Sequence, residues 1–310
     1  MNLWESGGMM IPEVEQKRRV YDAENAVGQR LRVLIWGAGN RQDHFEQILA
    51  ANIQQWGYNV VNSSGFARGQ AQGNEDKADV LVGDLDSTSR FSTGSNGLRS
   101  SPAESAWPAA FDAWCSQARL LIALSSSSIP RAALERLGAV ALLHKPFEMS
   151  QLQRYLRVLQ RVLVDRRPEG AQSYSDGHQG TGHEQSVRIL VVDDHKEVAN
   201  TIRACLEFET HYEVKVANEG LEALEQCMDW QPDCIVTDLL MPWMNGYQVM
   251  RSLSAGASIY APSFVVMSAL PQHELPVSRN VPKEKEIVYL DKPFQVNQLL
   301  QAVEVALAQK

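Results

Sequence analysis

The chain has 310 residues, of which 44% are hydrophobic and 21% charged, and its formal net charge is −8. That length is typical of about two domains, and the acidic balance argues against nucleic acid or an anionic membrane surface as the main partner. No apolar run reaches the roughly 20 residues of a membrane-spanning helix, and the first ten residues lack a signal-peptide layout. The four cysteines have no CxxC or metal-ligand spacing, so we expect reduced thiols in a cytoplasmic protein.

One segment, residues 168–183, is rich in Gly, Ser and polar residues and has no apolar periodicity, which predicts a flexible linker. The predicted organisation is an N-terminal extension over 1–30, a first domain over 31–165, a linker over 166–186 and a second domain over 187–310. The second domain holds ten basic and 17 acidic residues, so most of the net negative charge lies there.

The second domain alternates strand and helix patterns. Apolar, β-branched runs that predict strands lie at 188–193, 212–216, 234–238, 264–268 and 287–290, and most of the segments between them have helical spacing. This alternation predicts a parallel sheet with helices on both faces. Polar chemistry in such sheets gathers beyond the carboxyl ends of the strands, where Asp193, Asp194 and Asp238 are expected.

Three carboxylates at the ends of neighbouring strands predict a site for a hard cation, and Mg²⁺ fits because it binds few protein oxygens together with water and phosphate. Lys292, in a Lys-Pro-Phe segment, can hold a phosphoryl oxygen, and Ser268, followed by Ala269, can donate to another. With the metal and the lysine neutralising charge, Asp238 could act as a nucleophile and form an aspartyl phosphate.

These residues occur in an order that resembles the receiver domain of bacterial response regulators, and the resemblance covers residues 187–310. The residues that show it are Asp193-Asp194, Asp238 with the following Met-Pro turn up to Gly246, Ser268-Ala269 and Lys292-Pro293. The resemblance implies that Asp238 is the phosphorylated residue and that Mg²⁺ is held by Asp193, Asp194, Asp238 and the backbone carbonyl of Leu240. It also implies that Ser268 is the switch hydroxyl, that Lys292 binds the phosphoryl group, and that Tyr289 is the aromatic residue that changes rotamer.

The sequence departs from that family where the fourth helix of a receiver is expected. Pro271, Pro276 and Pro282 lie in this stretch, and proline interrupts helices. We therefore expect a remodelled output face.

The first domain repeats the plan of the second. Val33–Trp36 parallels Ile189–Val192, Ala78–Asp84 parallels Pro232–Asp238, and Leu142–Leu152 parallels Tyr289–Leu299, which indicates an internal duplication. The predicted fold class is therefore α/β, with two flavodoxin-like (βα)₅ receiver domains, each built on a five-stranded parallel sheet.

The first copy lacks part of the site. Gly37 and Ala38 stand where the second domain has its acidic pair, whereas Asp84, Ser125 and Lys145-Pro146 remain. The first domain therefore resembles a pseudo-receiver, in which we expect Asp84 to form an ion pair with Lys145. Asp86 as a substitute metal ligand is a less favoured alternative.

The resemblance implies a response regulator in a two-component phosphorelay, without a kinase domain or enzymatic activity toward other substrates. It would take its phosphoryl group from a sensor histidine kinase or a histidine phosphotransfer protein, and signal to a downstream protein by contact. One alternative is the receiver portion of a hybrid sensor histidine kinase, and another is a scaffold that works without phosphorylation. A third is an oxidoreductase with a nicotinamide at Gly37–Gly39, against which Gln42 argues because it replaces the third glycine of that motif.

Overall fold

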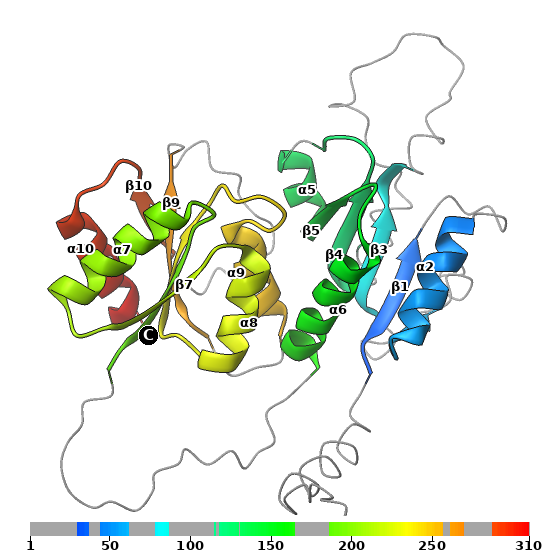
Figure 1. Ribbon diagram of the computed structural model, residues 1–310, viewed down its shortest axis with the longest axis horizontal. Helices are drawn as coiled ribbons and strands as arrows, with labels where there is room; N and C mark the ends of the chain where they lie inside the picture. The colour runs from blue at the N-terminus through cyan, green and yellow to red at the C-terminus, as the bar shows by residue number, and fades with distance from the viewer. Residues whose placement is uncertain are drawn as a thin grey trace, which may run out of the picture.

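The computed structural model describes residues 30–36, 44–61, 78–86, 115, 118–129, 131–164, 186–256, 261–269 and 287–309. Within these ranges the chain forms two five-stranded, all-parallel sheets with flanking helices (Figure 1). The predicted α/β fold class is therefore confirmed. Apart from Arg30 and Ser186, the predicted extension and linker lie outside the described residues, as do Gly37–Gly39 and the three prolines of the segment 271–282.

The first sheet has the strand order β2-β1-β3-β4-β5. Its elements are β1 (Arg32–Trp36), α2 (His44–Gln55), β2 (Asn59–Val61), β3 (Ala78–Asp84), β4 (Ala118–Ser125), α5 (Arg131–Leu137), β5 (Ala139–His144) and α6 (Met149–Leu163).

The second sheet has the order β10-β9-β8-β6-β7. Its elements are β6 (Arg188–Val192), α7 (Lys196–Glu209), β7 (Glu213–Ala217), α8 (Gly220–Trp230), β8 (Cys234–Asp238), α9 (Gly246–Ala255), β9 (Ser263–Ser268), β10 (Val288–Asp291) and α10 (Val296–Ala308). Counted along each domain, both sheets have the strand order 2-1-3-4-5 of doubly wound flavodoxin-like folds.

The strands form where the sequence has continuous apolar runs, because helices cover both faces of each sheet. All five residues of β8 are buried, as are the last six of β4. In the part of the chain that the structure describes, no helix is long and apolar enough to cross a membrane.

One of the hydrophobic clusters extends across both domains. Helices α8 and α9 lie between the second sheet and the first domain, where they contact α6 and β5 (Figure 1). A single cluster of buried residues includes Leu152 and Leu156 of α6 together with Leu224 and Met250 of the second domain. At the end of α9, a Cβ atom on Gly256 would lie 2.7 Å from the carbonyl oxygen of Val162, so glycine allows the close approach of α6.

Polar side chains of α9 donate hydrogen bonds to the backbone at the edge of the first sheet. The carbonyl oxygen of Ala139, at the start of edge strand β5, accepts hydrogen bonds from Gln248 Nε2 at 3.0 Å and Arg251 Nη1 at 3.3 Å. Both donors are at least 95% buried, and burial lowers the pKa of Arg251 although the nearby Glu135 opposes that shift. The edge strand is thereby covered by a helix of the other domain, which protects its carbonyl groups.

Charged residues of opposite sign face each other across the same boundary. Arg154 of α6 donates to Glu225 of α8 at 2.9 Å and also pairs with Glu219, and Arg161 lies 2.5 Å from Asp229. The bond to Glu225 is the main cause of the raised pKa of Arg154. The acidity of the second domain is thus used in part to bind the arginines of α6.

Charge reversal tests this docking. Arg154→Glu places like charges opposite α8, so we expect docking to weaken, a larger fraction of molecules to undock, and the mean radius of gyration from small-angle X-ray scattering at low salt to rise. Each of these half-exposed pairs stabilises docking by about 1 kcal/mol. Because salt screens exposed charges, the effect of the substitution should diminish at high salt. The double variant Arg154→Glu/Glu225→Arg should recover the compact form, and an unchanged radius in the single variant would contradict this account.

Candidate functional site

Acidic residues of two neighbouring strands meet at one edge of the second sheet. β6 pairs with β8, so Asp193, directly after β6, lies beside Asp238 at the end of β8. Asp193 is fully buried and Asp238 is 7% exposed. Two carboxylates this deeply buried need a cationic partner close to both.

Lys292 supplies that cation, and it follows edge strand β10, two strands away from β8. Its Nζ atom lies 3.1 Å from Asp193 Oδ2 and 3.2 Å from Asp238 Oδ2. The backbone amide of Lys292 donates to the carbonyl of Ser268 at 2.7 Å, which fixes the lysine beside the end of β9. The three residues that the sequence singled out on separate strands therefore lie together.

The donor set of this site fits a hard divalent cation. Asp193, Asp194 and His195 each place one ligand atom within 4.8 Å of the others. The buried Oδ1 atom of Asp194 accepts no hydrogen bond among the described residues, and its neighbour is Nδ1 of the exposed His195 at 3.2 Å. A buried carboxylate oxygen in that condition is one that a bound cation would satisfy. His195 was not among the residues singled out from the sequence, where its only signal was its place after the acidic pair.

Two sets of hydrogen bonds hold the loop after β8 against the site. The Leu240 amide donates to Asp238 Oδ1 at 3.3 Å, and Asn245 and Gln248 form a reciprocal capping box that starts α9. Gly246 follows the cap, where a Cβ atom would lie 2.8 Å from the carbonyl oxygen of Asp238. Only glycine lets the helix begin this close to the acidic strand end.

Ser268 and Tyr289 lie on the two strands beyond β8. Ser268 ends β9 and is 1% exposed, and Tyr289 lies on the neighbouring strand β10. The hydroxyl of Tyr289 is 3.2 Å from that of Tyr247, a buried residue of α9. Tyr289 therefore has a polar partner on the helix that follows the Asp238 loop.

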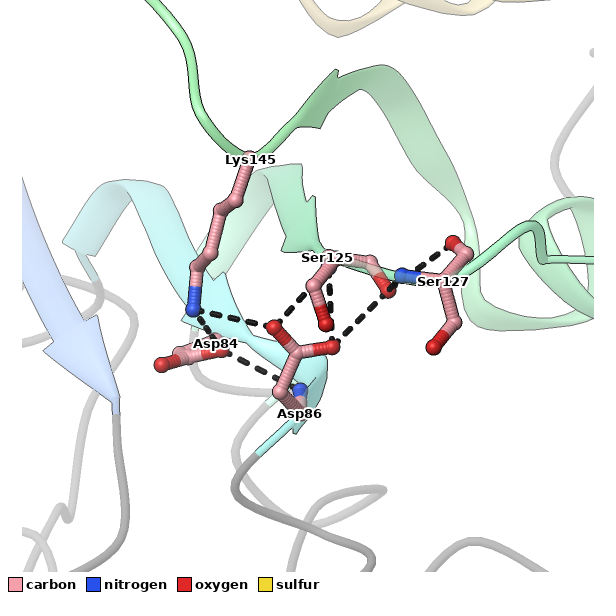
Figure 2. Close-up of polar contacts among 6 residues, drawn as sticks. Asp84, Asp86, Ser125, Ser127 and Lys145 are labelled. Carbon is pink, nitrogen blue, oxygen red and sulfur yellow. Dashed lines mark hydrogen bonds and ion pairs between the residues drawn. The ribbon is translucent and has the colours of Figure 1, made fainter.

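The first domain brings its remaining site residues together in a different way. Lys145 Nζ lies 2.6 Å from Asp84 Oδ1, so the predicted ion pair is confirmed. The same ammonium group lies 3.1 Å from Asp86 Oδ2 (Figure 2) and 4.7 Å from the ring centre of Phe45.

Comparison with known proteins agrees with the site of the second domain. The family model described as "Response regulator receiver domain" matches residues 189–304. These residues are a response regulator receiver domain. Asp193, Asp194, Asp238, Ser268 and Lys292 all lie within it.

Response regulators and a sensor kinase are among the proteins similar to this receiver domain. Response regulator MprA of Mycobacterium ulcerans is 37% identical over 116 residues, which are 37% of this chain and 47% of that protein. Sensor histidine kinase TmoS of Ectopseudomonas mendocina is 33% identical over 123 residues, 40% of this chain and 12% of that protein. A crystal structure of a response regulator signal receiver domain from Bermanella marisrubri is 33% identical, covers 39% of this chain and 98% of its own, and has a TM-score of 0.35. The chain thus spans about half the length of the response regulators it matches.

A pocket of about 400 Å³ lies between the receiver domain and the first domain. Asp194, Leu240 and Trp243 line it from the receiver domain, and His144 lines it from the first domain. The rings of His144 and Trp243 meet edge to face with centres 6.1 Å apart. A group of the first domain therefore contacts the loop that carries the candidate metal ligand Leu240.

Because Trp243 shares this pocket with Asp194 and Leu240, Mg²⁺ binding should change its fluorescence. We expect a saturable change during a Mg²⁺ titration, lost in Trp243→Phe and strongly weakened in Asp194→Asn, which removes one charged ligand. The same titration with Na⁺ at equal ionic strength controls for screening. A response that survives in Trp243→Phe would mean that another tryptophan reports the metal.

The close approach at Gly246 gives a second test. In Gly246→Ala the new methyl group must push against the Asp238 carbonyl, so we expect a loss of about 1–3 kcal/mol in unfolding free energy, measured by urea denaturation. Mg²⁺ affinity should fall as well, because the strand end that holds Asp238 moves. Ser254→Ala, on the exposed side of the same helix, is the control and should leave both quantities unchanged.

Proposed function

We propose that the receiver domain accepts a phosphoryl group on Asp238 from the phosphohistidine of a sensor histidine kinase or a histidine phosphotransfer protein. A carboxylate oxygen of Asp238 attacks phosphorus, and the P–N bond of the donor breaks with its electron pair going to the ring nitrogen. The donor histidine, protonated on its other ring nitrogen, leaves as neutral imidazole. The observation that carries the proposal is the position of Lys292, whose ammonium group lies within 3.2 Å of both Asp193 and Asp238. It can bind a phosphoryl oxygen where the new bond forms.

Mg²⁺ would be held by Asp193, Asp194, Asp238 and the Leu240 carbonyl, and it would offset the charge of the phosphoryl oxygens. Ser268 would donate its hydroxyl proton to a phosphoryl oxygen. Tyr289 would then change rotamer and give up its contact with Tyr247, which passes the phosphorylation state to α9. The domain would act only on its own phosphoryl group, as other receiver domains do, and such a relay would work in the cytoplasm.

The first domain, in this proposal, is a pseudo-receiver that regulates its neighbour through docking. Support comes from the shared strand order, the ion pair between Lys145 and Asp84, and the contacts of α6 and β5 with α8 and α9. Signalling onward would go to a downstream protein by contact.

A second candidate is the receiver portion of a hybrid sensor histidine kinase. The observation in its favour is the similarity to sensor histidine kinase TmoS, of which the matching region is 12%. The chemistry at Asp238 would be the same in both cases.

Intact-protein mass after incubation with acetyl phosphate tests the function directly. We expect one added phosphoryl group that depends on Mg²⁺, is absent in Asp238→Asn and is unchanged in Asp84→Asn. Two added groups would show that Asp84 is also an acceptor and that the pseudo-receiver assignment is wrong. If no group is added from acetyl phosphate or from a phosphorylated histidine phosphotransfer protein, the chain is a scaffold that works without phosphorylation.

A further inference from the structure

Asp86 of the first domain occupies the position that Leu240 occupies in the receiver domain. Each lies two residues after the acidic end of the third strand, and each backbone amide donates to that acid. The distance is 3.1 Å from Asp86 to Asp84 Oδ1 and 3.3 Å from Leu240 to Asp238 Oδ1. The backbones agree, but the side chains differ, because the receiver domain has a half-exposed leucine where the first domain has a carboxylate.

The Asp86 carboxylate collects hydrogen bonds from three directions (Figure 2). Ser125 Oγ donates to Oδ1 at 3.0 Å, and the Ser126 amide lies 2.9 Å from both oxygens. Lys145 Nζ lies 3.1 Å from Oδ2. A hydroxyl, a backbone amide and an ammonium group that converge on one point form a cradle for an oxyanion.

Two of these donors have counterparts with an assigned task in the proposed function. Ser125 ends β4 as Ser268 ends β9, and Lys145 follows β5 as Lys292 follows β10. In the receiver domain those two groups are proposed to bind phosphoryl oxygens. In the first domain they already bind the oxygens of Asp86.

The electrostatics of Asp86 agree with a bound anion. Partial burial alone would raise its pKa, but the hydrogen bonds from Ser126, Lys145 and Ser125 outweigh burial and hold the pKa below the ordinary value. The side chain is therefore ionised at neutral pH.

We propose that the Asp86 carboxylate is a permanent internal ligand of an oxyanion cradle formed by Ser125, Ser126 and Lys145, in the place where a phosphoryl group would lie in a working receiver. The first domain then holds its anion-bound arrangement at all times, and Asp84 is closed to phosphorylation. This inference rests on the pseudo-receiver assignment.

The cradle lies close to the part of the first domain that contacts the receiver domain. Lys145 directly follows β5, and α6 begins at Met149. These two elements form the side of the first domain that contacts α8 and α9 of the receiver domain. The Asp86 carboxylate, by binding Lys145, therefore fixes the backbone between β5 and α6, the two elements that contact the receiver domain.

The test is to empty the cradle and refill it from solution in the full chain. In Asp86→Ala, the ¹H–¹⁵N resonance of Ser126 should shift saturably on titration with formate or inorganic phosphate, and not with chloride at equal ionic strength. In the parent chain that resonance should not respond, because Asp86 already fills the cradle. Affinity for both anions should be at least about tenfold weaker in Asp86→Ala/Lys145→Met, which removes the cation.

Glu148→Ala is a matched control, since it removes an exposed carboxylate of the same domain outside the cradle. If Asp86→Ala folds and its Ser126 resonance ignores both anions, the cradle does not bind oxyanions and Asp86 is a structural ion pair only. Should Asp86→Ala not fold, Asp86→Ser keeps a polar group near the Ser126 amide, leaves room for formate, and has the same two outcomes. Neither result depends on acetyl phosphate, so failure of this inference is distinguishable from failure of phosphorylation at Asp238.

Discussion

Carboxylates crowded at the end of a parallel sheet repel one another, and in each domain of this chain a lysine after the edge strand offsets that repulsion. Lys292 lies between Asp193 and Asp238, and Lys145 lies between Asp84 and Asp86. In the receiver domain Lys292 pairs with two of the three acids, and the buried Oδ1 atom of the third, Asp194, accepts no hydrogen bond from the described residues. That imbalance favours a second cation. In the first domain, two acids face one lysine together with neutral donors, and the described groups satisfy each other.

The sequence predicted the two sheets, and it predicted that Asp193, Asp238 and Lys292 would lie close together at the strand ends. Buried parallel strands require continuous apolar runs, and the acids and the lysine follow those runs directly, so their meeting point could be inferred. The partners of Asp86 could not, because the direction of its side chain depends on the loop that leads Ser126 back toward the end of β3. The docking of the two domains could not be inferred either. In the sequence, Arg154 and Glu225 look like ordinary charged residues on the exposed faces of two separate helices.

Docking is tied to the site through the loop between β8 and α9. Trp243 has φ 64° and lies at the centre of a turn closed by the Met244 amide and the Pro242 carbonyl. Such a conformation costs a bulky residue about 1–3 kcal/mol, so the surroundings must compensate for it. The ring of His144 in the first domain is one such contact. Movement of the loop at Leu240 would therefore disturb the domain contact, and separation of the domains would leave the strained turn without that support.

In the proposed function the two sites differ in the source of their anion. The receiver domain has an aliphatic side chain at Leu240 and keeps its lysine on the acids, so an incoming phosphoryl group is the anion that can bring Ser268 and Lys292 together. The first domain has that anion covalently, in Asp86, at no cost in diffusion or binding entropy. Under the proposed function, β5 and α6 of the first domain would therefore keep their arrangement without any kinase, whereas α8 and α9 belong to the domain that would be phosphorylated. If Asp238 is phosphorylated as proposed, the first domain would stay constant while the receiver domain changes, and the strength of docking through α8, α9 and Trp243 would then report the state of Asp238.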